Sequence, residues 1–183
     1  MNRDEALKLV KEKIKNQNLI KHSLTVEACM KGLARNFKED EEKWDIAGLL
    51  HDIDYEETKD DPQKHSLVGA DFLERLGLDK EIFEAVKTHN EAHGIFPETL
   101  LAKSLYCVDP LTGLIVAATL VLPTKKINDL TVENVSNRFK EKSFARGATR
   151  EVILKCSEIG LSLEEFIKIC LESMQKMSNE LNL

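Results

Sequence analysis

Apolar residues recur at helical spacing along almost the whole chain, and this pattern constrains the fold more than any other feature. The amino-terminal segment is an example, because Ala6, Leu7, Val10 and Ile14 fall on one stripe of a helix. No segment shows the sustained alternation of apolar and polar residues that is typical of a half-buried strand. The sequence therefore predicts an all-α fold, a helical bundle without a parallel sheet.

Proline and glycine divide this pattern into segments. The charged segment 56–64 is expected to be a surface loop. Pro62 within it is well placed to begin the next helix, and Gly77 is well placed to end that helix. Pro110 is expected to interrupt a helix that opens at Pro97, because proline lacks the backbone N–H that a helix interior needs. Further segments with a helical pattern are 5–15, 20–37, 38–53, 80–93, 111–122, 149–159 and 162–179.

Length and charge limit the classes of function. A chain of 183 residues is long enough to bury a core, and its length favours one domain over two. The formal net charge of -6 argues against a protein that neutralises phosphate backbones, so we expect no nucleic acid polymer as a partner. A small phosphorylated substrate such as a nucleotide remains compatible, provided that bound cations supply the positive charge.

The sequence also favours a location in the cytoplasm. The amino-terminal stretch MNRDEALKLVKEKIK has no continuous apolar region, and no uncharged apolar run approaches the roughly 20 residues of a membrane helix. The four cysteines form no CxxC pair, which is typical of reduced thiols. We therefore expect no membrane partner, while apolar residues on the exposed face of LEEFIKICLESMQKM permit a homodimer.

The stretch AGLLHDI is the strongest functional signal. It has the composition of a buried helix but ends on His51 and Asp52, and burying a carboxylate is costly unless it is paired or binds a metal. All the other histidines also fall on predicted helices or at their ends: His22, His65, His89 and His93. Several histidines accompanied by carboxylates favour a metal site over isolated structural roles.

The order of His22, the adjacent pair His51 and Asp52, and the distant Asp109 resembles the HD-domain superfamily of metal-dependent phosphohydrolases. AGLLHDI and CVDPL look like the central elements of that family, and HSLVGA and VKTHN resemble the extra histidine segments of its two-metal subgroup. The resemblance covers about the first two thirds of the chain. It implies a single HD-like domain over residues 1–183, with a metal-site core at about 18–122 and helices at about 131–181 that complete the bundle.

Residue chemistry supports a ligand set of this kind. Adjacent residues near a helix end project about 100° apart, so His51 and Asp52 can both reach one ion that lies between them. His22 and Asp109 would complete a set of two nitrogen and two oxygen donors, which suits Fe, Mn, Zn, Ni or Co, with Mg as a further candidate. If Asp52 bridges, His65 and His89 could hold a second ion about 3.5 to 4 Å away, with a hydroxide between the two as the nucleophile.

Other residues are weaker candidates for the site. Asp54 follows the His51 and Asp52 pair closely enough to act as a general acid or base, so Asp52 and Asp54 are the candidate catalytic residues, although Asp54 also fits a solvated acidic loop. His93 is a candidate substrate contact, with a half-exposed loop residue as the alternative. Cationic candidates for a substrate phosphate are Lys125, Lys126, Arg146 and Arg150. The last two lie four residues apart and could bind one anion or form surface salt bridges.

The expected function is hydrolysis of a small phosphate ester, with a nucleotide as the expected substrate, by a metal-dependent enzyme. Two alternatives remain open at this point. A pair of irons held by histidines and carboxylates can also activate dioxygen, so the same ligands are compatible with an oxygenase on this scaffold. The domain could also be non-catalytic and bind a metal or a nucleotide without turnover.

Overall fold

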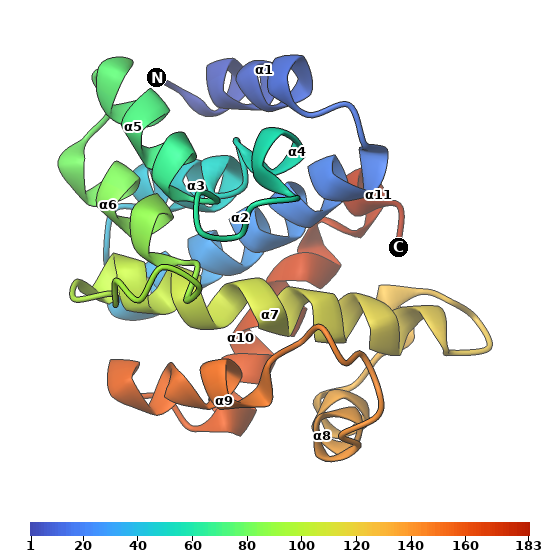
Figure 1. The fold of residues 1–183 in the computed structure, drawn as a ribbon. Coiled ribbons are helices and arrows are strands. Elements are labelled where there is room, and N and C mark those ends of the chain that lie inside the picture. The colour runs from blue at the N-terminus through green and yellow to red at the C-terminus, as the bar shows by residue number, and fades with distance from the viewer.

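A computed structural model describes all residues 1–183, and every regular element in it is a helix (Figure 1). The predicted all-α fold is confirmed. The α-helices are α1 (Arg3–Lys13), α2 (Gln17–Phe37), α3 (Glu41–Leu50), α4 (Tyr55–Thr58), α5 (Leu67–Arg75), α6 (Lys80–Thr88), α7 (Leu100–Leu120), α8 (Val132–Lys140), α9 (Arg150–Ile153), α10 (Leu163–Lys176) and α11 (Ser178–Leu181). Two short 3₁₀ segments are η1 (Ile127–Asp129) and η2 (Leu154–Ile159).

Helix α7 runs across the molecule, with α1 to α6 on one side and α8 and α9 on the other (Figure 1). It packs against α2, α6, α8 and α9, and its buried side chains belong to one continuous apolar cluster. This central position explains why α7 is the most apolar helix of the chain. One residue of α7, Asp109, therefore lies close to elements from both sides of the fold.

The close approach of α3 to α2 depends on Gly48. A Cβ atom built at Gly48 would lie 3.0 Å from the backbone of Glu27 in α2, closer than side chains normally pack. A glycine at this point lets the end of α3 lie directly beside α2. Because His51 follows α3 and His22 lies on α2, the same contact brings these two imidazoles together.

The predicted break at Pro110 does not occur. Helix α7 continues through Pro110, so the segments expected on either side of this proline form one helix of 21 residues. Proline removes one backbone donor from the helix, but Leu105 and Leu111 on its two sides are both fully buried. The burial of these apolar side chains on both sides of Pro110 outweighs the cost of the lost backbone hydrogen bond.

Two other boundaries differ from the sequence expectation in ways that matter for the site. Helix α5 begins at Leu67 rather than near Pro62, and α4 overlaps the start of the segment 56–64, which was expected to be a loop. Helix α6 ends at Thr88, which leaves His89 as its capping residue. As a result, His51 and His89 cap the carboxyl ends of helices, and His65 lies in the turn before α5.

Helix α7 is also the only helix long and apolar enough to meet a length and hydropathy criterion for a membrane span. This is weak evidence, because the core helix of a soluble protein meets the same criterion, and 61% of the relevant window is buried inside the fold.

Gly113 in α7 has no packing role, so replacing it should stabilise the helix. A Cβ at this exposed position meets no atom within 4 Å. Glycine in a helix interior costs about 0.5 to 1 kcal/mol relative to alanine, so Gly113→Ala should raise the free energy of unfolding by about that amount. Urea denaturation measures the change. Gly48→Ala is the contrasting variant and should destabilise the protein, and a loss of stability in Gly113→Ala would contradict this account.

Candidate metal centre

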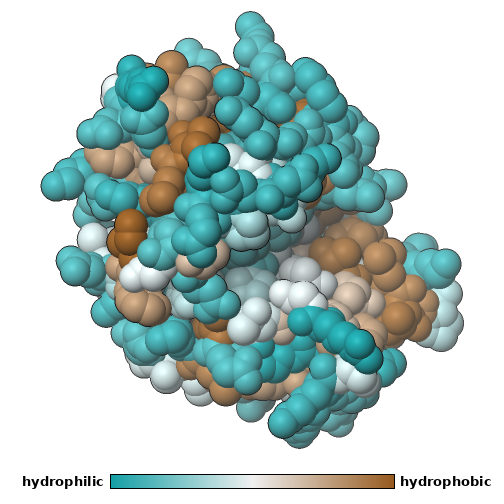
Figure 2. Space-filling model, viewed as in Figure 1, coloured by the Kyte–Doolittle hydropathy of each residue, from teal (hydrophilic) through white to brown (hydrophobic).

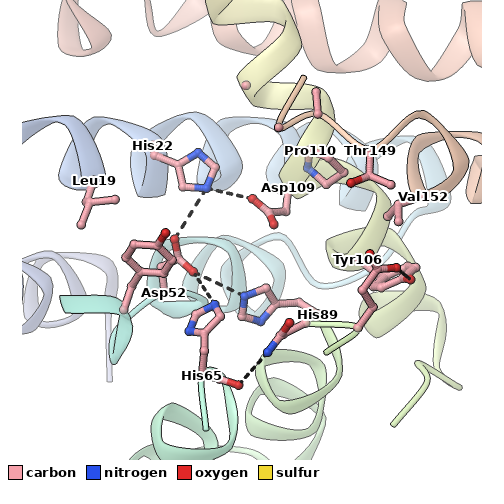
Figure 3. A pocket seen from close by; sticks show the side chains of 16 residues that line it. Leu19, His22, Asp52, His65, His89, Tyr106, Asp109, Pro110, Thr149 and Val152 are labelled. Carbon is pink, nitrogen blue, oxygen red and sulfur yellow. Dashed lines mark hydrogen bonds and ion pairs between the residues drawn. The ribbon is translucent and has the colours of Figure 1, made fainter. Parts of the chain in front are cut away.

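The carboxylate of Asp52 lies between two pairs of histidines, of which Figure 3 shows His22, His65 and His89. Its Oδ1 atom is 3.3 Å from Nε2 of His65 and 3.4 Å from Nε2 of His89. Its Oδ2 atom is 3.5 Å from Nε2 of His51 and 3.7 Å from Nε2 of His22. Each oxygen of one carboxylate therefore faces its own pair of imidazole nitrogens, the arrangement expected of a carboxylate that bridges two ions.

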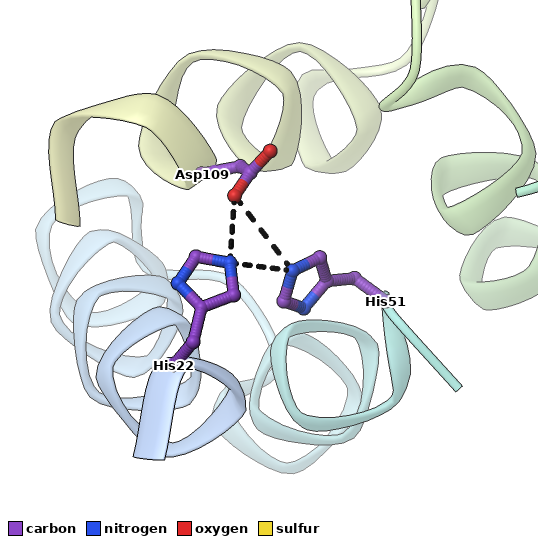
Figure 4. A group of neighbouring side chains, drawn as sticks. All are labelled: His22, His51 and Asp109. Atoms are coloured by element: carbon purple, nitrogen blue, oxygen red, sulfur yellow. Dashed lines mark hydrogen bonds and ion pairs between the residues drawn. The ribbon is translucent and has the colours of Figure 1, made fainter. Parts of the chain in front are cut away.

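Asp109 joins the pair formed by His22 and His51 (Figure 4). Its Oδ1 atom is 2.8 Å from Nε2 of His22 and 3.8 Å from Nε2 of His51, and the two Nε2 atoms are 3.2 Å apart. These three residues come from α2, from the end of α3 and from α7. Their donor atoms all lie within 4.8 Å of one another, as do those of a second group formed by His51, Asp52 and His89.

Backbone carbonyls at two helix ends orient His51 and His89. The Nδ1 atom of His51 donates to the carbonyl of Gly48 at 2.8 Å, and that of His89 donates to the carbonyl of Val86 at 2.6 Å. Both rings are thereby fixed with a bare Nε2 atom toward Asp52. The Nε2 atom of His89 is buried without a hydrogen-bond partner, which is unfavourable unless a cation takes that lone pair.

Asp54 orients His65 rather than lining the cavity. Its Oδ1 atom accepts from Nδ1 of His65 at 3.1 Å, and its Oδ2 atom accepts from the backbone N–H groups of Ser66 and Gly69 at 2.8 and 2.9 Å. The side chain is almost fully buried by these contacts. The structure thus does not place Asp54 where the predicted general acid or base would stand, and it gives Asp54 a positioning role.

Thr112 orients His22 in the same way. Its hydroxyl donates to the carbonyl of Asp109 at 2.8 Å and can accept from Nδ1 of His22 at 3.4 Å. All four imidazoles therefore have an acceptor at Nδ1 and present Nε2 to the carboxylates. Such outer contacts are typical of histidines that bind metals, because they fix both the ring and its tautomer.

The charged groups in the cluster shift one another's pKa values strongly. Burial lowers the pKa of His22, but the hydrogen bond and charge of Asp109 outweigh it and raise the pKa to about 9. Burial also lowers the pKa of His65, yet Asp52 and Asp54 raise it to about 10. For His51, the effect of burial is larger than that of the charges of Asp52 and Asp109, and the pKa is lowered to about 4. A divalent ion bound at His22 or His65 would therefore displace a proton near neutral pH.

The two carboxylates respond in the opposite sense. Burial acts to raise the pKa of Asp52, but the surrounding imidazoles hold it well below its usual value. The pKa of Asp109 is lowered as well, because its hydrogen bond to His22 outweighs the effect of burial. Both carboxylates are thus ionised across the physiological range, as metal ligands must be.

The donor set fits divalent metal ions. It combines imidazole nitrogens with carboxylate oxygens, a mixture suited to first-row transition ions. The structure brings together every predicted ligand: His22, His51, Asp52, His65, His89 and Asp109. That these residues bind metal, and which metal they bind, remains a prediction.

A cavity of about 390 Å³ opens above these ligands. Its wall includes residues that the sequence did not single out: Leu19, Asn90, Glu91, Tyr106, Thr149 and Val152. Thr149 and Val152 come from the carboxyl-terminal third, which was expected to complete the bundle and to shape the pocket. No lysine or arginine lines this cavity.

The predicted cationic contacts are not part of the cavity wall. The guanidinium of Arg150 donates to backbone carbonyls of the loop before α9, at 2.7 Å from Phe144 and 2.6 Å from Ala148, so it is not aimed at an anion together with Arg146. Arg146 and Lys125 are exposed and lie outside the lining residues. Arg150 therefore fastens a loop, a use of guanidinium donors that sequence spacing cannot reveal.

His93 is also used within the fold. The hydroxyl of Ser66 donates to the carbonyl of Lys87 at 2.8 Å, and Nε2 of His93 donates to that hydroxyl at 2.8 Å. The backbone N–H of Ile95 donates to Nδ1 of His93 at 3.3 Å. His93 thus ties the loop after α6 to the residue beside His65, and it does not line the cavity as the predicted substrate contact would.

Several bacterial proteins named Ribonuclease Y are curated relatives of this chain. A relative from Nitratidesulfovibrio vulgaris (strain DP4) is 29% identical over 171 residues, which is 91% of this chain and 32% of the relative. One from Lawsonia intracellularis is 32% identical over 139 residues, or 74% of this chain and 26% of the relative. The chain spans about a third of the length of these relatives. No solved structure matches it.

These relatives overturn one sequence expectation. The net charge of -6 led us to expect no nucleic acid polymer as a partner, and a match over most of the chain to proteins named as ribonucleases contradicts that expectation. Net charge was a poor guide because it averages over the whole surface, whereas bound divalent ions set the charge that a phosphate meets locally.

Asp54→Asn tests the positioning role of Asp54. The amide can still accept from a backbone N–H, but it holds the His65 ring less well than a carboxylate. We expect the affinity for Mn²⁺ at the His65 side to fall by about 10 to 100-fold, the usual effect of losing a contact behind a metal ligand. Calorimetric titration measures it. Asp71→Asn, which removes an exposed partner of Arg75, is the control, and unchanged affinity in Asp54→Asn would contradict the role.

The family comparison agrees with the geometry. The model of the HD domain matches residues 19–114, just over half of the 183 residues. The matched range contains all six clustered ligands, from His22 in α2 to Asp109 in α7. The resemblance expected from the sequence is confirmed, and the chain belongs to the HD domain family.

Proposed function

We propose that this HD domain is a metal-dependent phosphodiesterase that hydrolyses single-stranded RNA. The observation that carries the proposal is the position of Asp52, with one carboxylate oxygen toward His65 and His89 and the other toward His22 and His51. In this arrangement Asp52 would join two metal positions at the floor of an open cavity. Divalent ions in such positions supply the charge that activates water and stabilises a phosphoryl group in hydrolysis.

The electrostatics of the cavity support a metal-dependent reaction. Asp52, Glu91 and Asp109 line it, and it has no lysine or arginine. A phosphodiester would meet a negative surface here unless cations neutralise the carboxylates. The four imidazoles and two carboxylates are the groups of this chain that can hold those cations.

The polar wall of the cavity is fixed in place, which suits a site that must hold a phosphodiester in one orientation. The hydroxyl of Tyr106 donates to Glu91 at 3.2 Å, and burial together with Glu91 raises the pKa of Tyr106 to about 12, so the hydroxyl keeps its proton. The amide of Asn90 donates to the carbonyls of Pro62 and His65 at 2.7 and 3.0 Å. Orientation of this kind contributes to rate by holding the reacting groups in place.

Two observations support RNA as the substrate. The relatives named Ribonuclease Y match up to 91% of the chain, which favours RNA over the free nucleotide expected from the sequence. The cavity opens within a hollowed region on one face of the molecule (Figure 2). A single strand can enter such a hollow and expose its backbone to the ligands, whereas a duplex keeps its bases stacked.

The test is cleavage of a fluorescent single-stranded oligoribonucleotide by metal-loaded protein. The wild-type chain should cleave it in Mn²⁺ and lose activity in a chelator. Asp52→Asn should reduce kcat/KM by at least about a hundredfold, as expected when a group that organises the charge of the site is removed. The helical circular dichroism signal should be unchanged.

Asp71→Asn is the matched control, because it makes the same chemical change on the exposed face of α5 and should leave cleavage intact. Cleavage that survives both Asp52→Asn and chelation would contradict the proposal, as would no cleavage by the metal-loaded wild type. The oxygenase and the non-catalytic alternatives are distinguished in the same samples, by substrate-dependent oxygen consumption and by ligand binding without turnover.

A further inference from the structure

A second cavity of about 390 Å³ adjoins the one that contains the metal ligands. The two cavities share His22 and Gly113, so the second begins directly beside the first. It lies between the beginning of α2, the second half of α7 and the carboxyl-terminal residues near α11. None of the candidate site residues predicted from the sequence lies in it except His22.

The chemistry of this second cavity differs from that of the first. No aspartate or glutamate side chain lines it, and its one lysine, Lys21, makes no ion pair. Val116, Leu120 and Leu181 supply apolar surface, and Leu120 is half exposed although it is a large aliphatic residue. Figure 2 shows apolar surface beside the hollow. A cation next to an apolar wall suits a ligand that carries both an anionic group and a planar ring.

Gly113 stands at the junction of the two cavities. It is exposed in the middle of α7, and an added Cβ would meet nothing within 4 Å, so neither close packing nor backbone conformation requires a glycine. A glycine that weakens its helix without a packing reason calls for another explanation. Gly113 lines both cavities, and a side chain larger than a methyl group would extend into the space where they adjoin.

We propose that the second cavity binds the nucleotide that adjoins the scissile phosphodiester in single-stranded RNA. The base packs on Val116, Leu120 and Leu181, the phosphate on its far side pairs with Lys21, and the strand passes over Gly113. This inference rests on the proposed function, because it assumes that the scissile phosphate lies at the metal ligands. Charge complementarity and continuity with the first cavity identify the occupant as an extension of the substrate.

The first experiment compares Lys21→Gln with Lys168→Gln. Lys168 is exposed on α10 and outside both cavities, so the control removes the same charge elsewhere. For cleavage of an oligoadenylate, log(kcat/KM) should decrease with log[NaCl]. The steepness of this decrease should be smaller by about one in Lys21→Gln, the effect of losing one phosphate contact. It should not change in Lys168→Gln. Hydrolysis of bis(p-nitrophenyl) phosphate, which has no further phosphate, serves as the reference reaction.

The second experiment fills the space where the cavities adjoin with Gly113→Leu and compares it with Gly113→Ala. The ratio of kcat/KM for the oligoadenylate to that for bis(p-nitrophenyl) phosphate should fall at least about fivefold in Gly113→Leu, the lower end of what one base contact contributes. Gly113→Ala should keep most of the ratio. A ratio and a salt slope that stay at wild-type values in Gly113→Leu and Lys21→Gln would overturn the inference.

A measurement of RNA binding distinguishes a failure of this inference from a failure of the proposed function. Fluorescence anisotropy reports oligoadenylate binding whether or not the strand is cleaved. Wild-type binding that weakens in Lys21→Gln and Gly113→Leu supports the subsite even if no cleavage occurs, in which case only the proposed function fails. Cleavage by the wild type with unaltered binding and ratio in both variants overturns the subsite alone. A change of oligomeric state in these variants without an effect on RNA binding or cleavage would contradict the subsite and assign the second cavity to contact with a second copy of the chain.

Discussion

Burying the carboxylate of Asp52 is the constraint on which the rest of the site depends. The residue is 6% exposed, and an ionised carboxylate at such a position is strongly unfavourable unless positive charge surrounds it. The fold meets this requirement by placing an imidazole nitrogen within 3.7 Å of its oxygens from each of four segments of the chain. The four histidines come from α2, the end of α3, the turn before α5 and the end of α6, so this one carboxylate contacts four parts of the fold.

Helix ends perform much of this positioning. His51 and His89 both cap the carboxyl end of a helix, and each donates from Nδ1 to the carbonyl three residues before it, in Gly48 and Val86. Carbonyls in the last turn of a helix lack a partner within the helix, so they are available as acceptors. The carboxyl ends of α3 and α6 also carry partial negative charge, which favours a cation between them. The same local geometry thus orients two candidate ligands and supports the ions that they are expected to hold.

The sequence was sufficient for the helical fold and for the set of side chains that the fold brings together around Asp52, because helical periodicity and the pairing of His51 with Asp52 are local signals. It was not sufficient for roles that depend on tertiary contacts. Asp54 has the appearance of a catalytic carboxylate beside the motif, yet its oxygens are taken by His65 and two backbone N–H groups. Arg150 resembled an anion-binding residue, but the loop before α9 supplies its acceptors. Pro110 was expected to end a helix, and packing on both of its sides outweighs that preference.

The most direct test of the central claim is the number of metal ions per chain, measured by mass spectrometry on protein purified without chelator or affinity-bound nickel and then equilibrated with Mn²⁺. If Asp52 bridges two positions, the wild type should hold about two ions and His65→Ala about one. The variant removes a ligand from one side of Asp52 and leaves His22, His51 and Asp109 on the other. Equal metal content in the wild type and in His65→Ala would contradict a site divided by the two oxygens of Asp52.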